Sequence, residues 1–61
     1  MERREIHISA AMSDERINEL IQTATRDDIV IMDRQSRSRG WARKVPSGIA
    51  VRVLDNYSPV D

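Results

Sequence analysis

The chain has 61 residues, with ten Lys and Arg side chains balanced by ten Asp and Glu side chains, and it has no cysteine. A chain this short forms one domain at most and buries only about 60% of the surface that its unfolded form exposes. The lack of cysteine and the single histidine exclude disulfides and any thiolate or histidine-rich zinc site. We therefore expect one small domain, residues 1–61, that gains stability by forming a homodimer.

The first segment with regular patterning predicts a strand. Residues 4–9 alternate, with Ile6 and Ile8 on one face and His7 on the other. This period of two is typical of a half-buried strand.

The next segment, MSDERINELIQTAT, predicts an amphipathic helix. Ser13 is a good N-cap because its hydroxyl can accept a hydrogen bond from a free amide of the first turn. Met12 and Ile17 are spaced for a hydrophobic staple, and the helix is expected to end near Thr25, before the acids Asp27 and Asp28. The apolar stripe of this helix consists of Ile17, Leu20, Ile21 and Ala24.

The second half of the chain predicts further strands. IVIM, residues 29–32, is apolar on both faces, which indicates a central strand. Residues 34–40 are expected to form a loop. Residues 41–45 and 49–54 then flank the turn sequence VPSG, in which Pro46 suits the second turn position and Gly48 the fourth.

These elements together predict the fold class. The chain is expected to be an α+β domain of order β-α-β-β-β, with one amphipathic helix packed on a small sheet. Residues 55–61 are expected to form an irregular C-terminal arm. One helix covers only one face of a sheet. Dimerisation through the sheet, or through the exposed face of strand 29–32, is therefore expected to complete the fold.

Charge is distributed unevenly along the chain. Residues 1–33 hold four basic and eight acidic side chains, whereas residues 34–54 hold six basic side chains and no acidic one. Such segregation bears on binding partners, although attraction between the two halves would also account for it. The six basic residues are Arg34, Arg37, Arg39, Arg43, Lys44 and Arg52.

The segment RQSRSRGWARK, residues 34–44, is the strongest functional signal. Arginine matches phosphate oxygens bidentately, and Trp41 is a candidate for stacking on an unpaired base. The alternative is that Trp41, the only tryptophan, is the main aromatic residue of the core. We expect a non-enzymatic regulatory protein in which this segment and Arg52 contact nucleic acid. The competing hypothesis is an inhibitor or accessory factor, of the type that phages and mobile elements encode, which docks the same basic surface on an acidic protein.

Catalytic, metal and cofactor sites are not predicted. His7 has no cysteine nucleophile to activate, and no serine stands in a nucleophile-elbow context. Asp27 and Asp28 are adjacent, and no further carboxylates recur at the spacing of a calcium loop. Gly40 and Gly48 belong to no phosphate-binding glycine motif.

Membrane and export signals are also missing. No apolar run approaches the roughly 20 residues of a membrane span, and MERREIH lacks the apolar region of a signal peptide. We expect a cytoplasmic protein with no membrane partner.

Two family resemblances bear on these expectations. IHISAAMSDERINELI resembles the start of the small 4-oxalocrotonate tautomerases, but the N-terminal proline on which those enzymes depend is replaced by Glu2. IVIMD also begins only four residues after Thr25, too soon for the long helix of that family. The segment from IHIS to IVIMDR is similar to antitoxins of the Phd/YefM type, without their long toxin-binding tail. That resemblance implies a homodimeric, DNA-binding repressor.

Overall fold

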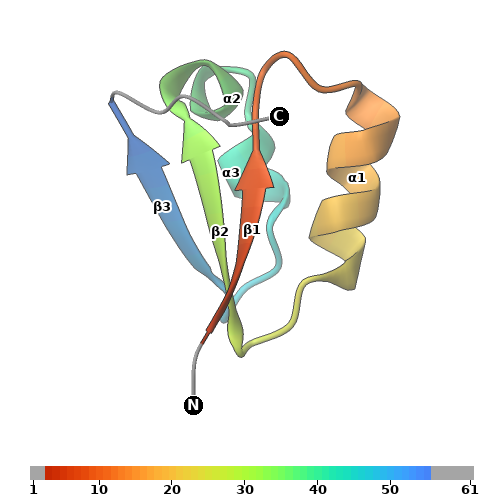
Figure 1. The fold of residues 1–61 in the computed structure, drawn as a ribbon, viewed down its shortest axis with the longest axis vertical. Coiled ribbons are helices and arrows are strands. Elements are labelled where there is room, and N and C mark those ends of the chain that lie inside the picture. Colours follow the sequence, from red (N-terminus) through yellow and green to blue (C-terminus); the bar gives the residue numbers. More distant parts are fainter. Residues whose placement is uncertain (1–2, 56–61) are drawn as a thin grey trace.

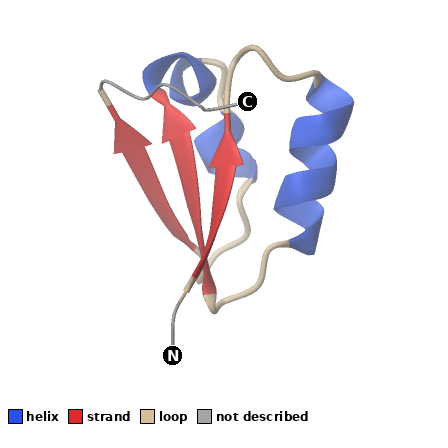
Figure 2. Cartoon of the chain, in the orientation of Figure 1, coloured by secondary structure: helices blue, strands red, loops and turns tan. Residues whose placement is uncertain are grey.

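The computed structural model describes residues 3–55 as one layer of strands and one layer of helices (Figures 1 and 2). The arm predicted for residues 55–61 lies outside the described residues, apart from Asp55. In chain order the elements are β1 (Arg4–Ile8), α1 (Asp14–Thr23), β2 (Asp28–Asp33), α2 (Arg34–Ser38), α3 (Trp41–Lys44) and β3 (Ala50–Leu54).

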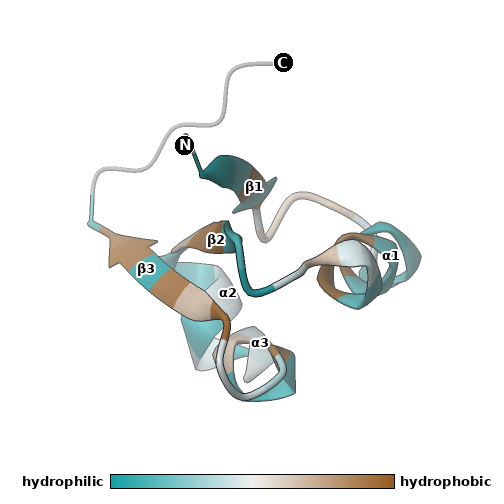
Figure 3. Cartoon of the chain, turned by 90° about the horizontal axis from the view of Figure 1, so that it is seen from below, coloured by the Kyte–Doolittle hydropathy of each residue, from teal (hydrophilic) through white to brown (hydrophobic). Residues whose placement is uncertain are grey.

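The three strands form one parallel sheet in the order β1-β2-β3. β2 is central, and its Val30 pairs with Ile6 of β1 and with Val51 of β3. Both crossovers move to the next strand in the same direction, and crossovers of this type are right-handed, so both bring their helices to the same face of the sheet. Figure 3 shows α1, α2 and α3 on one side of the sheet. Within residues 3–55, no helix covers the other side, which we call the open face.

The mixed α and β class is confirmed, but the predicted β-α-β-β-β order is wrong in its second half. Residues 34–38 form a helix instead of a loop, and residues 41–44 form a helix instead of a strand. The domain described by residues 3–55 therefore has three helices and three strands. Two neighbouring parallel strands cannot be joined by a hairpin, so the chain between β2 and β3 has to cross over one face of the sheet.

The predicted VPSG turn is present, one residue later than expected. The amide of Ile49 donates to the carbonyl oxygen of Pro46 over 3.3 Å, which makes Pro46 the first turn residue. Gly48 is then the third, and its φ of 95° is the positive value that this position of a type II turn requires. The turn joins α3 to β3 and does not join two strands.

The N-terminal half agrees closely with the sequence-based expectations. Ser13 caps α1, since its Oγ accepts from the Arg16 amide over 3.2 Å. The helix ends at Thr23, two residues before the predicted end near Thr25. α1 has ten residues, and within residues 3–55 no helix is long and apolar enough to cross a membrane.

The core lies between the sheet and the helices. Val30 and Met32 of β2 are fully buried on the helix side, while Ile31, only 4% exposed, lies on the open face between His7 and Arg52. The prediction of a central strand buried on both faces is confirmed. The buried core cluster consists of Ile6, Ile8, Ile17, Ile21, Val30, Met32, Trp41 and Val45.

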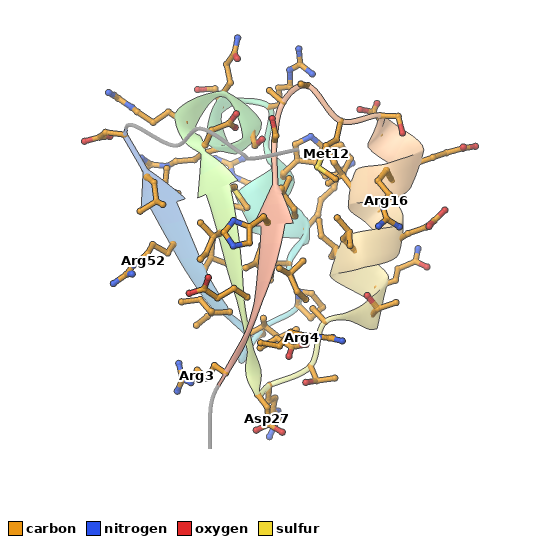
Figure 4. The ribbon with its side chains drawn as sticks, viewed as in Figure 1. Arg3, Arg4, Met12, Arg16, Asp27 and Arg52 are labelled. Carbon is orange, nitrogen blue, oxygen red and sulfur yellow. The ribbon has the colours of Figure 1, made fainter. Side chains whose placement is uncertain are left out.

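A polar contact fixes the entry to β2. The Asp28 carboxylate accepts from Nη2 of Arg4 and from the Thr25 amide, each over 2.8 Å. Hydrogen bonding by Arg4 is the main reason that the pKa of Asp28 lies below its ordinary value. Figure 4 shows Arg4 at the same end of the molecule as Asp27 and the end of α1, and its Nη2 also donates to the Thr23 carbonyl over 3.3 Å. Asp28 therefore fastens β1 to the chain that leaves α1.

Candidate nucleic-acid interface

Residues 34–44, called here the basic segment, begin directly at the carboxyl end of the central strand. Asp33 ends β2 and is the N-cap of α2, and its Oδ1 accepts from the Ser36 amide over 2.8 Å. A side-chain oxygen at this position satisfies an amide that has no partner within the helix. The cap turns the chain from strand to helix without an intervening loop, and Arg34 is consequently the first residue of α2.

Asp33 also binds the loop between β1 and α1. Its Oδ2 accepts from the amide of Ala10, in the loop between β1 and α1, over 3.2 Å. Burial raises the pKa of Asp33, but the hydrogen bonds from Ser36 and Ala10 outweigh it, and the pKa lies below its ordinary value. The carboxylate therefore serves two backbone amides and holds α2 against the β1–α1 loop.

Gly40 separates the two short helices of the basic segment. Its φ of 90° lies in the left-handed region, which a residue with a side chain rarely adopts. The amide of Gly40 donates to the Arg37 carbonyl over 2.9 Å, which closes α2, and α3 begins at the next residue. This break turns the chain so that Trp41 enters the core.

Trp41 is a core residue in this structure. Only 5% of its surface is exposed, and it belongs to the cluster beneath the sheet. Nζ of Lys44 lies 4.5 Å from the centre of the Trp41 ring, within the range of a cation–π interaction. A ring buried in this way offers no face to an incoming base, so the arrangement corresponds to the core alternative for Trp41 and leaves binding to the charged groups.

The remaining residues of the predicted site fall into two groups. Arg34, Arg37 and Arg39 lie on or directly after α2, and Arg43 and Lys44 lie on α3; all five are exposed. Arg52 does not join them, because its pairing with Ile31 places it on the open face. Figure 4 shows Arg52 extending from β3 away from the helices. The sequence could not separate the two groups, because the predicted hairpin placed residues 41–54 in a single element.

Within residues 3–55, little acidic charge opposes the basic segment. Its only ion pair joins Nε of Arg34 to Oδ1 of Asp55 over 3.6 Å, and both side chains are more than 70% exposed. Nη1 of Arg39 donates to the Ala10 carbonyl over 3.4 Å. Arg37 and Arg43 form no ion pair or side-chain hydrogen bond with any residue in this range. No ion pair within residues 3–55 joins the basic segment to an acid of residues 1–33.

Asp33 is the residue that the sequence interpretation missed. In the charge distribution it is one of the eight acidic side chains of residues 1–33. The available signal was an aspartate directly before a run of polar helix-compatible residues, which is typical of an N-cap.

In the part of the chain that the structure describes, the other chemical groups do not converge on a site. Nε2 of His7 lies 3.2 Å from Oε1 of Glu5, and both of these side chains of β1 are exposed. Asp28 is engaged by Arg4. Residues 3–55 contain no group of three or more His, Asp or Glu side chains that could hold a metal ion. In open parallel sheets, ligands bind where the direction of strand succession reverses. The order β1-β2-β3 has no such reversal.

The chain was also compared with known proteins. No family model, curated protein or solved structure matches it. The two resemblances seen in the sequence are consequently not supported by a family match.

Proposed function

We propose that the protein is a non-enzymatic binding protein whose basic segment grips the phosphate backbone of a nucleic acid. The observation that carries the proposal is that five cationic side chains of residues 34–44 are exposed, and only Arg34 forms an ion pair within residues 3–55. Exposed cations that lack acidic neighbours gain most from a polyanion, because binding releases the counterions of the phosphates.

Recognition in this proposal depends on charge and position. Trp41 is buried, so stacking on bases contributes nothing. Within residues 3–55, Arg37 and Arg43 have no partner that would hold them in one orientation for reading base edges. Phosphate contacts of this kind fix the position of a protein on the nucleic acid and carry no sequence information directly. We therefore propose binding with little sequence preference, in which Arg52 does not take part because it lies on the opposite face.

The test is a salt titration of binding to labelled duplex DNA and single-stranded RNA of mixed sequence. If all five cations contact phosphates, the logarithm of the affinity for duplex DNA falls with the logarithm of salt concentration with a slope of about −4 to −5. The double variant Arg37→Ala, Arg43→Ala should flatten that slope by about two contacts. These two residues are chosen because neither has a partner within residues 3–55 whose loss would disturb the fold.

The control variant is Arg16→Ala, Arg26→Ala, which removes the same charge from exposed positions outside the basic segment. It should keep the wild-type slope. Trp41 fluorescence should barely change on binding, since the ring is 5% exposed. Failure to retain either nucleic acid at about 50 mM salt, where electrostatic binding is strong, would overturn the proposal and favour an acidic protein partner. Equal slopes for the two double variants would show that the basic segment is not the surface that contacts phosphates.

A further inference from the structure

The outer strand of the sheet, β3, presents one large apolar side chain to solvent. Val51 is 37% exposed, and it is the exposed large hydrophobic residue of the range 3–55. Val53 and Ile49 are partly buried against the core, whereas Val51 is not among the residues packed there. Figure 1 shows no helix beyond β3 on this side of the sheet. An edge strand also carries a row of backbone amides and carbonyls that the sheet does not use.

The opposite edge of the sheet differs in each of these respects. β1 contains the charged residues Arg4 and Glu5, and charged residues on an edge strand discourage pairing with another chain. α1 lies on the β1 side of the molecule (Figure 1). β3 has a single charged residue, Arg52. The molecule therefore has one protected edge and one unprotected edge.

Two-fold symmetry restricts how two copies of β3 could pair. An isologous contact uses the same surface of both copies. Successive side chains of a strand point to opposite faces. If both open faces are to lie on the same side, the antiparallel pair must therefore be centred on one residue that lies opposite its own copy. A centre at Arg52 would place two guanidinium groups directly opposite each other, which is destabilising. A centre at Val53 would place Val51 opposite Asp55.

A centre at Val51 gives favourable pairs throughout. Val51 then faces its own copy, and Ile49 faces Val53 on the helix side of the sheet, where the register with β2 places both valines. On the open face the long side chain of Arg52 lies over the small Ala50. The segment from Ile49 to Val53 is thus complementary to itself, which is why a second copy fits this edge better than an unrelated strand.

We propose that two copies of this chain associate through antiparallel pairing of β3 with β3, centred on Val51, into one continuous sheet. Each copy contributes three strands. The symmetry axis runs perpendicular to the sheet, so the helices of both copies lie on the same face, and the two basic segments lie on that face on either side of the axis. This association stands independently of nucleic-acid binding, because it rests on the edge of β3 and not on the cations.

The expected interface is small. A strand of five residues is only about 17 Å long, so we expect the contact to bury less than about 1,200 Å². Interfaces of that size are weak or transient. The dimer should accordingly dissociate on dilution through the micromolar range. The pairing buries Val51, the large hydrophobic residue that a single copy leaves exposed within residues 3–55.

Sedimentation velocity over a concentration series tests the association. The wild-type protein should shift from one copy to two as concentration rises. Val51→Lys should remain a single copy with an unchanged circular dichroism spectrum, because Val51 is not packed against the core. Gln22→Lys, which adds the same charge at an exposed position of α1, should associate like the wild type. A wild-type protein that stays monomeric at high concentration, or a Val51→Lys variant that still dimerises, would overturn the proposal.

Single-cysteine variants test the register, since the natural chain has no cysteine. Residues directly opposite each other in antiparallel strands have Cα atoms about 4.5–5.5 Å apart, within the range of a disulfide. Val51→Cys should therefore cross-link readily to its own copy under mild oxidation. Arg52→Cys should not, because its Cα would lie roughly 8 Å from its symmetry mate. Preferential cross-linking of Arg52→Cys would refute a centre at Val51.

Discussion

Replacing Asp33 by alanine should destabilise the domain by removing two hydrogen bonds at once. Loss of an N-cap costs about 1 kcal/mol. Loss of the partner of the Ala10 amide costs about 1 kcal/mol more, so the expected total for Asp33→Ala is roughly 2 kcal/mol. For a chain of 61 residues the whole free energy of unfolding is about 3–9 kcal/mol. With an m-value of about 1 kcal/mol per molar urea, the midpoint should fall by about 2 M.

Urea unfolding followed by the fluorescence of buried Trp41 measures this effect directly. Asp33→Ser retains an oxygen that can cap α2 but is too short to serve Ala10 as well, so it should lose about half as much stability. Asp27→Ala removes an exposed aspartate whose carboxylate accepts no hydrogen bond within residues 3–55, and it should leave the midpoint unchanged. An unchanged midpoint for Asp33→Ala, or equal losses for the alanine and serine variants, would refute the two-bond role of Asp33.

The effect should also depend on pH. Burial opposes ionisation of Asp33, but its hydrogen bonds prevail and lower the pKa below the ordinary value of 3.8. A carboxyl group with a lowered pKa in the folded state contributes stability that is complete above its unfolded pKa and is lost as pH falls through its folded pKa. The difference between wild type and Asp33→Ala should therefore be full at neutral pH and shrink below about pH 4.

Four further changes probe other parts of the structure. Trp41→Ala should lower the free energy of unfolding by about 3–5 kcal/mol, seen as partial unfolding by circular dichroism in buffer. Ile31→Ala should cost about 2–5 kcal/mol in urea titrations, and a small effect would contradict its burial on the open face. Asp28→Asn should weaken the contact with Arg4 and make unfolding less sensitive to acid, since the pKa of Asp28 is lowered. Ser36→Ala should increase the free energy of unfolding by about 1 kcal/mol, seen as a higher thermal midpoint, because the buried Ser36 Oγ has no partner within residues 3–55.

Elements with a strong local signal could be predicted from the sequence. Alternation identified β1, the cap and apolar stripe identified α1, and the doubly apolar run identified β2 as central. β3 was also placed within one residue of its observed bounds. In each case the pattern is long enough, or sufficiently marked by a cap or turn, to favour one periodicity.

Residues 34–44 could not be predicted in the same way. WARK is only four residues long, and so short a segment fits a strand and a helix equally well. The tertiary structure decides between strand and helix here. β2 and β3 run parallel, so the chain between them must pass over one face of the sheet. The same error affected the candidate site, because a hairpin would have placed Arg52 beside the basic segment, whereas the parallel strand sends it to the open face.

The parallel sheet also has a consequence for how the domain folds. Arg4 pairs with Asp28, and Ile29 pairs with Ala50, so every strand contact closes a loop of more than twenty residues. No pair of strands can meet through a tight turn, and the entropy of loop closure opposes each pairing before its contacts are made. α1 has its own cap and first-turn acids, so local interactions favour it before the strands pair. We therefore expect the sheet to assemble after α1, and folding to be slower than that of helical domains of similar length, whose contacts are local.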